Sequence, residues 1–213
     1  MTQEIGGFAA FELHPNILAA VIATGYEEPS AIQQQSIPII MAGHDMIGQA
    51  QTGTGKTAAF ALPILHRIDP TKREPQALIL APTRELALQV ATAFETYAKQ
   101  MPGVTVVAVY GGAPMGPQLK AIRNGAQIVV ATPGRLCDHL RRDEKVLATV
   151  NHLVLDEADE MLKLGFMDDL EVIFKALPAT RQTVLFSATL PQSIRAIAER
   201  HLRDPKHVKI QTK

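Results

Sequence analysis

The sequence predicts an α/β domain, with a doubly wound, mostly parallel sheet covered by helices on both faces. Short aliphatic and β-branched runs alternate along the chain with amphipathic stretches such as 84–99 and 193–202. Several runs are continuously apolar, as in Ala-Leu-Ile-Leu-Ala at 77–81, which is typical of strands buried on both faces. Regular strand–helix alternation favours parallel strands joined by right-handed crossovers.

The apolar runs that we predict as strands are, in chain order, Asp45–Gln49, Ala77–Ala81, Val104–Tyr110, Gln127–Ala131, His152–Leu155, Thr183–Phe186 and His207–Ile210. Five of them are followed at once by a polar segment, namely Gln51–Thr57, Pro82–Ala87, Thr132–Arg135, Asp156–Asp159 and Ser187–Thr189. Because the carboxyl ends of parallel strands share one edge of the sheet, where open α/β folds bind ligands, these segments are expected to meet there. The sequence therefore predicts a site on that rim.

Composition sets the class of protein. The 213 residues are 46% hydrophobic and 20% charged, which fits one globular α/β domain. No apolar run reaches the roughly 20 residues that span a bilayer, and the N-terminal Met1–Glu4 lacks the basic-then-apolar layout of a signal peptide. We therefore expect no membrane partner. The single cysteine, Cys137, excludes an internal disulfide and favours a reducing, cytoplasmic setting.

Charge and histidine usage exclude other classes of site. The 21 Lys and Arg residues match the 21 Asp and Glu residues, so any nucleic-acid site has to be a local patch. None of the histidines stands at metal-ligand spacing from cysteine or another histidine. We therefore expect no metal site made of protein ligands alone.

A phosphate-binding loop is predicted after the first strand, where the chain reads Ala50-Gln51-Thr52-Gly53-Thr54-Gly55-Lys56-Thr57. This is the Walker A spacing, although the general pattern begins with Gly where this chain has Ala50. Its glycines let backbone N–H groups and a helix N-terminus face the β- and γ-phosphates of a nucleotide. Lys56 is predicted to contact those phosphates, and the Thr57 hydroxyl to ligate Mg²⁺.

A second motif ends a strand in two acids, Leu153-Val154-Leu155-Asp156-Glu157, which is the Walker B arrangement. Asp156 is predicted to hold Mg²⁺, partly through water, and Glu157 to orient and polarise the attacking water. Acids also follow strands simply as helix N-caps. The presence of a phosphate loop on the same rim favours ATP or ADP binding, with Lys56, Asp156 and Glu157 as catalytic residues.

Together these segments resemble the DEAD-box RNA helicases. Asp156-Glu157-Ala158-Asp159 resembles the motif that names the family, and Gly25–Gln33 resembles its Q motif. The remaining segments follow in the family's order, and the resemblance covers nearly the whole chain, looking most like the bacterial cold-shock and ribosome-assembly members. It implies a RecA-like P-loop NTPase domain over residues 1–213, with a Q-motif flank at 1–43 and a P-loop core at 44–213.

The resemblance implies an adenine site near the Q motif. Gln33 would hydrogen-bond the adenine edge, the Tyr26 ring would stack on the base, and Phe8 would be the upstream aromatic that packs nearby. A side-chain amide suits this task because it donates and accepts at once. However, Ser30-Ala31-Ile32-Gln33 also fits a capping box, in which Gln33 reaches back to the Ser30 backbone N–H. The sequence leaves both interpretations open.

The resemblance also implies an RNA-binding surface. Thr83 and Thr132 are predicted to cap helices whose first turns, each with an arginine, suit backbone phosphates. Such contacts read backbone and 2′-hydroxyl, so little sequence preference is expected; the alternative is that these residues are caps and turns only. The implied RNA-binding residues are Pro82, Thr83, Arg84, Gly111, Gly112, Thr132, Pro133, Gly134 and Arg135.

The last motif, Ser187-Ala188-Thr189, resembles the segment that links the ATP rim to domain closure. The hydroxyls of Ser187 and Thr189 are expected to hydrogen-bond the acids of Asp156–Asp159. Asp159, Ser187 and Thr189 are thus the predicted coupling residues.

The family's second RecA-like domain, which carries the arginine finger, has no counterpart in this sequence, and the resemblance implies that it follows in cis. We expect a parent protein that hydrolyses ATP and locally unwinds RNA, and a chain, cut near 210–213, that binds adenine nucleotides, hydrolyses ATP weakly and does not unwind. Two alternatives remain: a naturally truncated nucleotide-gated binding module, and a small-molecule P-loop kinase. The kinase leaves the segments at 82–87 and 132–135 unexplained.

Overall fold

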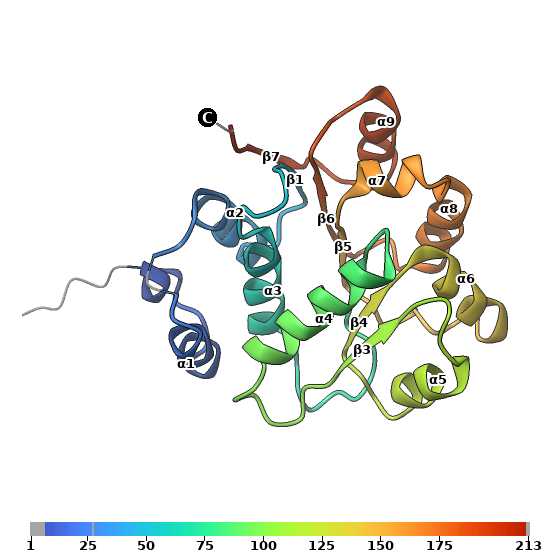
Figure 1. Ribbon diagram of the computed structural model, residues 1–213, viewed down its shortest axis with the longest axis horizontal. Helices are drawn as coiled ribbons and strands as arrows, with labels where there is room; N and C mark the ends of the chain where they lie inside the picture. Colours follow the sequence, from blue (N-terminus) through green and yellow to red (C-terminus); the bar gives the residue numbers. More distant parts are fainter. Residues whose placement is uncertain (1–6, 27, 212–213) are drawn as a thin grey trace, which may run out of the picture.

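The computed structural model describes residues 7–26 and 28–211. Met1–Glu4, Glu27 of the predicted Q motif, and residues 212–213 at the predicted cut lie outside these ranges. One sheet has the strand order β3-β4-β2-β5-β6-β1-β7, and every pairing in it is parallel (Figure 1). The strands are β1 Met46–Gln49, β2 Ala77–Leu80, β3 Val106–Val109, β4 Ile128–Ala131, β5 His152–Leu155, β6 Gln182–Ser187 and β7 Lys206–Lys209.

Three helices precede the first strand in the described part of the chain, namely η1 Gly7–Phe11, α1 Pro15–Ala23 and α2 Ala31–Met41. The helices between the strands are α3 Lys56–Arg67, α4 Arg84–Tyr97, α5 Met115–Arg123, α6 Pro133–Arg142, α7 Ala158–Lys163, α8 Met167–Ala176 and α9 Gln192–His201. Among the residues that the structure describes, none of these helices is long and apolar enough to cross a membrane.

The predicted fold class is confirmed, and each predicted strand is present with ends that differ from the observed ones by at most two residues. The strand at 104–110 is shorter than predicted, because β3 is one of the two edge strands of the sheet and has a single ladder partner, β4, over Val106–Val109. The strand at 183–186 is longer, at Gln182–Ser187, because β6 lies between β5 and β1 and has a ladder partner on each side. Strand ends thus follow the neighbouring strands, which the local sequence does not specify.

Two apolar layers cover the sheet. On β2, Ile79 packs with α1–α4 in one layer, whereas Leu78 and Leu80 pack with α5–α9 in the other. The first layer contains a cluster of three rings, with the Phe60 centroid 6.1 Å from that of Phe94 and 5.7 Å from that of Phe186. Burial on both faces explains why the strands read as continuous apolar runs.

Buried polar side chains tie together the amino-terminal edge of the sheet. The Gln182 amide donates to the carbonyl oxygens of Ile40 and His44 at 3.0 and 2.8 Å and accepts from Arg67 at 2.9 Å. Gln76 and Gln127, which also immediately precede or begin strands, bond main-chain groups in the same way. At this edge, glutamine side chains therefore form hydrogen bonds with the main-chain N–H and carbonyl groups of the loops.

Asp45 is the charged member of this edge and is only 6% exposed. One of its carboxylate oxygens accepts the Thr183 N–H at 2.8 Å, and the other accepts the Arg203 N–H at 2.7 Å. The carboxylate thus joins the start of β6 to the turn before β7.

Candidate functional site

The predicted polar segments lie together at the carboxyl edge of the sheet. They follow β4, β2, β5, β6 and β1, which are adjacent in the strand order. The segments at 132–135 and 82–87, with the glycine pair after β3, occupy the β3-β4-β2 half. The acids, Ser187–Thr189 and the phosphate loop occupy the β5-β6-β1 half. The rim is therefore divided in two along the sheet.

The phosphate loop connects β1 to α3 through two glycines in the left-handed region. Gly53 has φ +83° and Gly55 has φ +84°, a conformation that costs other residues energy. The Thr54 hydroxyl donates to the Gln51 carbonyl at 2.8 Å and closes the loop. No side chain caps the first turn of α3, and a Cβ added to Gly53 would meet nothing within 4 Å. The helix N-terminus is thus open to an anion such as a phosphate.

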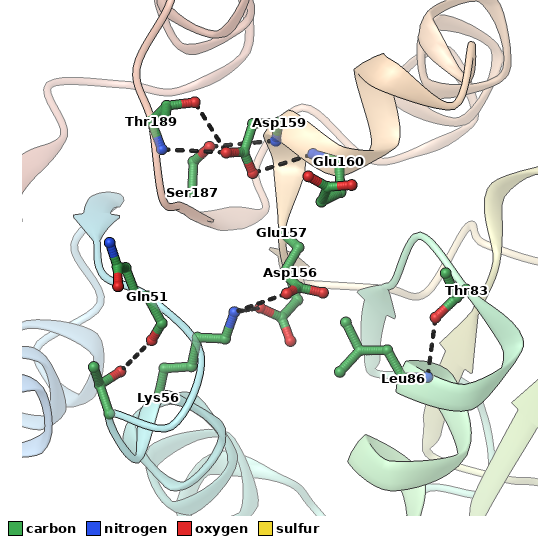
Figure 2. A network of polar contacts seen from close by, with 11 residues as sticks. Gln51, Lys56, Thr83, Leu86, Asp156, Glu157, Asp159, Glu160, Ser187 and Thr189 are labelled. Atoms are coloured by element: carbon green, nitrogen blue, oxygen red, sulfur yellow. Dashed lines mark hydrogen bonds and ion pairs between the residues drawn. The ribbon is translucent and has the colours of Figure 1, made fainter.

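Lys56, the first residue of α3, points across the rim at both Walker B acids (Figure 2). Its ammonium lies 2.9 Å from Asp156 Oδ1 and 4.0 Å from Glu157 Oε1. The side chains of Lys56 and Asp156 are 7% and 0% exposed, and that of Glu157 is 24% exposed. The structure thus brings the three predicted catalytic residues into one partly buried cluster.

The Asp156 carboxylate is under-satisfied. Its Oδ1 lies close to Lys56 without the alignment of a hydrogen bond, and its Oδ2 has no partner among the described residues. Burial raises the pKa of this carboxyl above its ordinary value, and the Lys56 ammonium opposes the rise. A buried oxygen with unused lone pairs is what a hard divalent cation requires. Asp156 therefore fits its predicted role as a Mg²⁺ ligand.

Glu157 has a strained backbone. Its φ of 52° and ψ of 54° place a residue with a long side chain in the left-handed region, directly before α7. Such a conformation costs about 1–3 kcal/mol and is concentrated at functional sites. Burial, followed by the neighbouring acids, raises the pKa of the Glu157 carboxyl, while Lys56 lowers it.

Asp159 joins the acids to the segment after β6. Its Oδ2 accepts from the Thr189 N–H at 3.2 Å and from the Thr189 hydroxyl at 2.9 Å (Figure 2). The Ser187 hydroxyl accepts the Asp159 backbone N–H at 3.2 Å, and it also interacts with the Asp159 carboxylate, whose pKa it helps to lower. Burial would raise the pKa of Asp159, but these hydrogen bonds outweigh it and the net pKa is lowered.

A cleft of about 270 Å³ separates the loop from the acids, lined by Ala50, Gln51, Thr52, Lys56, Glu157, Asp159, Glu160 and Ala188. A larger cavity, of about 570 Å³, lies between α6 and α8. None of the predicted site residues lines that second cavity, so its size does not mark it as the site.

Gln33 contacts the phosphate loop. Its Oε1 accepts the Ser30 N–H at 2.9 Å, as a capping box requires, and its Nε2 donates to the Gly55 carbonyl at 3.0 Å. The fit is close, because a Cβ added to Gly55 would come within 2.6 Å of Gln33 Nε2 and 2.9 Å of Ser30 Oγ. The predicted capping interaction is present, and the same amide also binds the loop.

Tyr26 and Phe8, the other residues of the predicted adenine site, pack against each other. Their ring centroids are 6.0 Å apart, and Phe8 is buried at 3% exposure whereas Tyr26 is 45% exposed. The buried Phe8 ring thus packs against a ring that keeps exposed surface, and exposed aromatic surface suits stacking on a planar ligand such as a base.

On the other half of the rim, the two predicted helix caps differ. The Thr83 hydroxyl accepts the Leu86 N–H at 3.2 Å and caps α4. Thr132 stands at the N-cap of α6 but makes no capping hydrogen bond, so that part of the prediction was wrong. Thr132 is buried, and Pro133 at the first helical position removes one of the N–H groups that would need a partner.

The arginines on this half also differ. Arg84 is exposed and lies over the Tyr110 ring, with its guanidinium carbon 4.9 Å from the ring centroid. The Arg135 guanidinium donates to the Ala113 carbonyl at 2.8 Å and to Gln118 Oε1 at 3.4 Å. Tyr110 and Gln118 were not predicted as site residues. The position of Tyr110, immediately before the glycine pair, was the available signal.

Comparison with known proteins identifies the family. The family model described as DEAD/DEAH box helicase matches residues 30–197. The chain is 54% identical over 205 residues to a protein of Klebsiella pneumoniae named ATP-dependent RNA helicase DeaD, covering 96% of this chain and 32% of that protein. It is 52% identical over 206 residues to the protein of the same name from Mycobacterium tuberculosis (strain ATCC 25618 / H37Rv), covering 97% and 37%.

A solved structure has the same fold. The chain superimposes on the crystal structure of a DEAD box protein from the hyperthermophile Methanococcus jannaschii with a TM-score of 0.92 and 40% sequence identity. The match covers 96% of this chain and 56% of that one. The chain spans about a third of the length of the curated relatives it matches, namely 32% and 37% of the two proteins named above.

Proposed function

Because the chain belongs to the DEAD/DEAH box helicase family, we propose that residues 1–213 are the first RecA-like domain of an ATP-dependent RNA helicase. The parent protein would hydrolyse ATP to ADP and phosphate, coupled to local unwinding of RNA duplexes, with a second RecA-like domain in cis. The observation that carries the proposal is the divided rim. The segments that we propose to bind nucleotide follow β5, β6 and β1, and those that we propose to bind RNA follow the adjoining β3, β4 and β2.

Gln33 is the proposed adenine reader. A side-chain amide has two acceptor lone pairs and two donor hydrogens. The capping bond from Ser30 and the bond to the Gly55 carbonyl use one of each, so one donor and one acceptor remain. Adenine offers a matching N6 donor and N7 acceptor. The cap and the adenine site are thus compatible in one side chain, and Tyr26 would stack on the base above Phe8.

Phosphates would be bound by Ala50–Thr57. Backbone N–H groups at the uncapped start of α3 face the anion, and the Lys56 ammonium stabilises negative charge on the β- and γ-phosphates. Thr57 and Asp156 would hold Mg²⁺, which when bound neutralises phosphate charge. Glu157 would orient the attacking water and accept its proton.

RNA would lie across Thr83, Arg84, the pair Gly111–Gly112 and the segment Thr132–Arg135. The N-termini of α4 and α6 offer N–H groups to successive phosphates, and the arginines add charge. These groups read the sugar-phosphate backbone, so binding with little sequence preference is proposed. The contacts of Asp159 with Ser187 and Thr189 would relay nucleotide state to the second domain.

The chain alone is proposed to hydrolyse ATP weakly and not to unwind. Its transition state would lack the arginine of the second domain, and such a residue contributes about 10³–10⁵ in rate in related P-loop enzymes. Because ATP and RNA are the proposed ligands, we propose a cytoplasmic location.

The test is calorimetry of ATP, ADP and GTP, each with Mg²⁺, on the chain and on Gln33→Ala. We expect adenine nucleotides to bind, GTP to bind at least ten-fold more weakly, and Gln33→Ala to remove this preference. The matched control is Gln34→Ala, because Gln34 lies on the same helix and its side-chain amide donates to the Pro29 carbonyl at 3.0 Å rather than to the phosphate loop. Equal binding of ATP and GTP, unchanged by Gln33→Ala, would show that Gln33 is a helix cap only.

A further inference from the structure

The RNA half of the rim contains an aromatic–arginine pair that the proposed function does not explain. Tyr110 follows β3 and precedes Gly111, and its ring lies under the guanidinium of Arg84 at the start of α4. Arg84 is exposed and forms no ion pair with any described residue. Its orientation therefore depends on the ring.

The glycine pair after Tyr110 also lies close to the Arg84 guanidinium. Gly112 has φ +84°, and a Cβ added there would be 3.8 Å from Arg84 Nη1. The guanidinium thus lies close to the backbone of the turn as well as to the ring. A guanidinium stacked by its face keeps its N–H groups in the plane free for a phosphate.

The Tyr110 backbone is itself fixed by a buried amide. Gln118, on α5 and 6% exposed, donates from Nε2 to the Tyr110 carbonyl at 3.0 Å. Its Oε1 accepts from Arg135 at 3.4 Å and lies 3.2 Å from His139 Nε2. Arg135 also holds the Ala113 carbonyl at 2.8 Å, so the turn from 110 to 113 is held at both ends.

We propose that Tyr110 is a positioning residue for RNA binding, which holds Arg84 ready for a backbone phosphate, and that Gln118 holds Tyr110 in place. The inference rests on the proposed RNA function. An arginine already ordered in the free protein loses less side-chain entropy when the phosphate arrives, which raises affinity without a new contact. The ring touches Arg84 rather than RNA, so its effect depends on that arginine.

The test measures the dissociation constant of the chain for a fluorescein-labelled decamer of uridine by anisotropy at low salt. A cation–π pair at an exposed site is worth about two- to five-fold in affinity, so Tyr110→Leu should raise the dissociation constant by that factor. Tyr110→Phe keeps the ring and is the matched control, with an affinity like that of the unchanged chain. ADP affinity should be unchanged in both variants.

A double-mutant cycle separates positioning from loosening of the fold. In an Arg84→Ala background, Tyr110→Leu should have no further effect, because the residue through which it acts is gone. Gln118→Met should weaken RNA binding in the unaltered background and add less than its full effect to Tyr110→Leu.

Three results would overturn the inference. The first is an RNA affinity that Tyr110→Leu leaves unchanged. The second is a loss of RNA affinity in Tyr110→Phe as large as that in Tyr110→Leu. The third is a double variant in which the fold-changes in dissociation constant of Arg84→Ala and Tyr110→Leu multiply in full. Each leaves the proposed function standing if the unchanged chain binds the decamer. If the unchanged chain does not bind it, the proposed RNA function fails, and this inference fails with it.

Discussion

Two buried aspartates at opposite edges of the same sheet are treated in opposite ways. Asp45, at the amino edge, is 6% exposed, and each carboxylate oxygen accepts a main-chain N–H, at 2.8 and 2.7 Å. Asp156, at the carboxyl edge, is 0% exposed, and its Oδ2 has no partner in the part of the chain that the structure describes. The Asp45 carboxylate is hydrogen-bonded through both oxygens within the fold, whereas the Asp156 carboxylate has one oxygen paired with the Lys56 ammonium and the other without a partner among the described residues.

The difference shows how stability and function are separated in this domain. Buried polar groups are normally hydrogen-bonded, and the exceptions call for a functional reason. The amino edge follows the rule through Asp45, Gln76, Gln127 and Gln182. The carboxyl edge breaks it at Asp156 and adds a strained backbone at Glu157. An unsatisfied buried oxygen and a strained backbone thus occur at the edge where a ligand is expected, whereas the buried carboxylate at the amino edge is fully hydrogen-bonded.

The strongest way to break this comparison is Asp45→Ala. The change leaves the N–H groups of Thr183 and Arg203 without their acceptor, and we expect the free energy of unfolding to fall by about 3–5 kcal/mol. Chemical denaturation measures it. Asp45→Asn, which keeps one acceptor oxygen, is the control and should lose about half as much. A loss below about 1 kcal/mol for Asp45→Ala would show that the amino edge does not depend on this carboxylate.

A pH experiment tests the same edge through His152, which faces Gln182 Oε1 at 3.2 Å. Burial, with the nearby Arg67 charge, lowers the pKa of His152 from 6.5 to about 4, and the Gln182 bond opposes this. Below pH 6.5 the unfolded chain takes up a proton that the folded chain refuses. Stability should therefore fall as the pH drops from 6.5 to 4, by about 3 kcal/mol from this group.

Other groups titrate in this range, so the readout is the difference between the unchanged chain and His152→Gln. That variant keeps an amide donor for Gln182 and cannot take the proton. Urea unfolding at several values of pH should show the two stabilities converging, or crossing, as the pH falls. A constant difference from pH 7 to pH 4 would mean that His152 is not buried as a neutral group.

The smallest stability effect is expected at the opposite edge, for Asp156→Asn. Asparagine keeps the shape and removes a buried charge, while Lys56 retains Glu157 at 4.0 Å. We expect the free energy of unfolding to stay within about 1 kcal/mol or to rise, and Mg²⁺-dependent ATP affinity to be lost. Denaturation and calorimetry on one sample measure both. A fall of more than about 2 kcal/mol would make Asp156 a structural anchor like Asp45.

Much of the architecture could be predicted from the sequence. The apolar runs gave the strand His152–Leu155 with its observed bounds, and the segments that follow strands gave the rim. The predicted ends failed where a neighbour decides them: Gln182 joins β6 because its N–H donates to the Asn151 carbonyl at 2.9 Å. Strand pairing is a long-range property that local composition does not contain.

The sequence could predict which residues lie at the site, but not which of their atoms are in contact. Motif spacing indicated that Lys56 and Asp156 share a rim, and it could not indicate that their charged atoms lie 2.9 Å apart. Gln118 was not predicted as a site residue, and it is buried on α5, where its amide donates to the Tyr110 carbonyl in the turn after β3. Asp45 was placed at the start of a strand, with nothing nearby to show that its partners lie at positions 183 and 203.

The boundary between the two halves of the rim is the pairing of β2 with β5, where Leu80 is in register with Leu155. The Asp156 N–H continues that ladder with a 2.9 Å bond to the Leu80 carbonyl, so the acid on one side and the Pro82 segment on the other are fastened to the same backbone. Because the backbone pairing is continuous here, the two halves of the rim are rigidly connected and this boundary cannot act as a hinge. Under the proposed function, we expect the two halves of the rim to move as one unit, so that a force applied by a second domain to bound RNA would be distributed over the whole sheet.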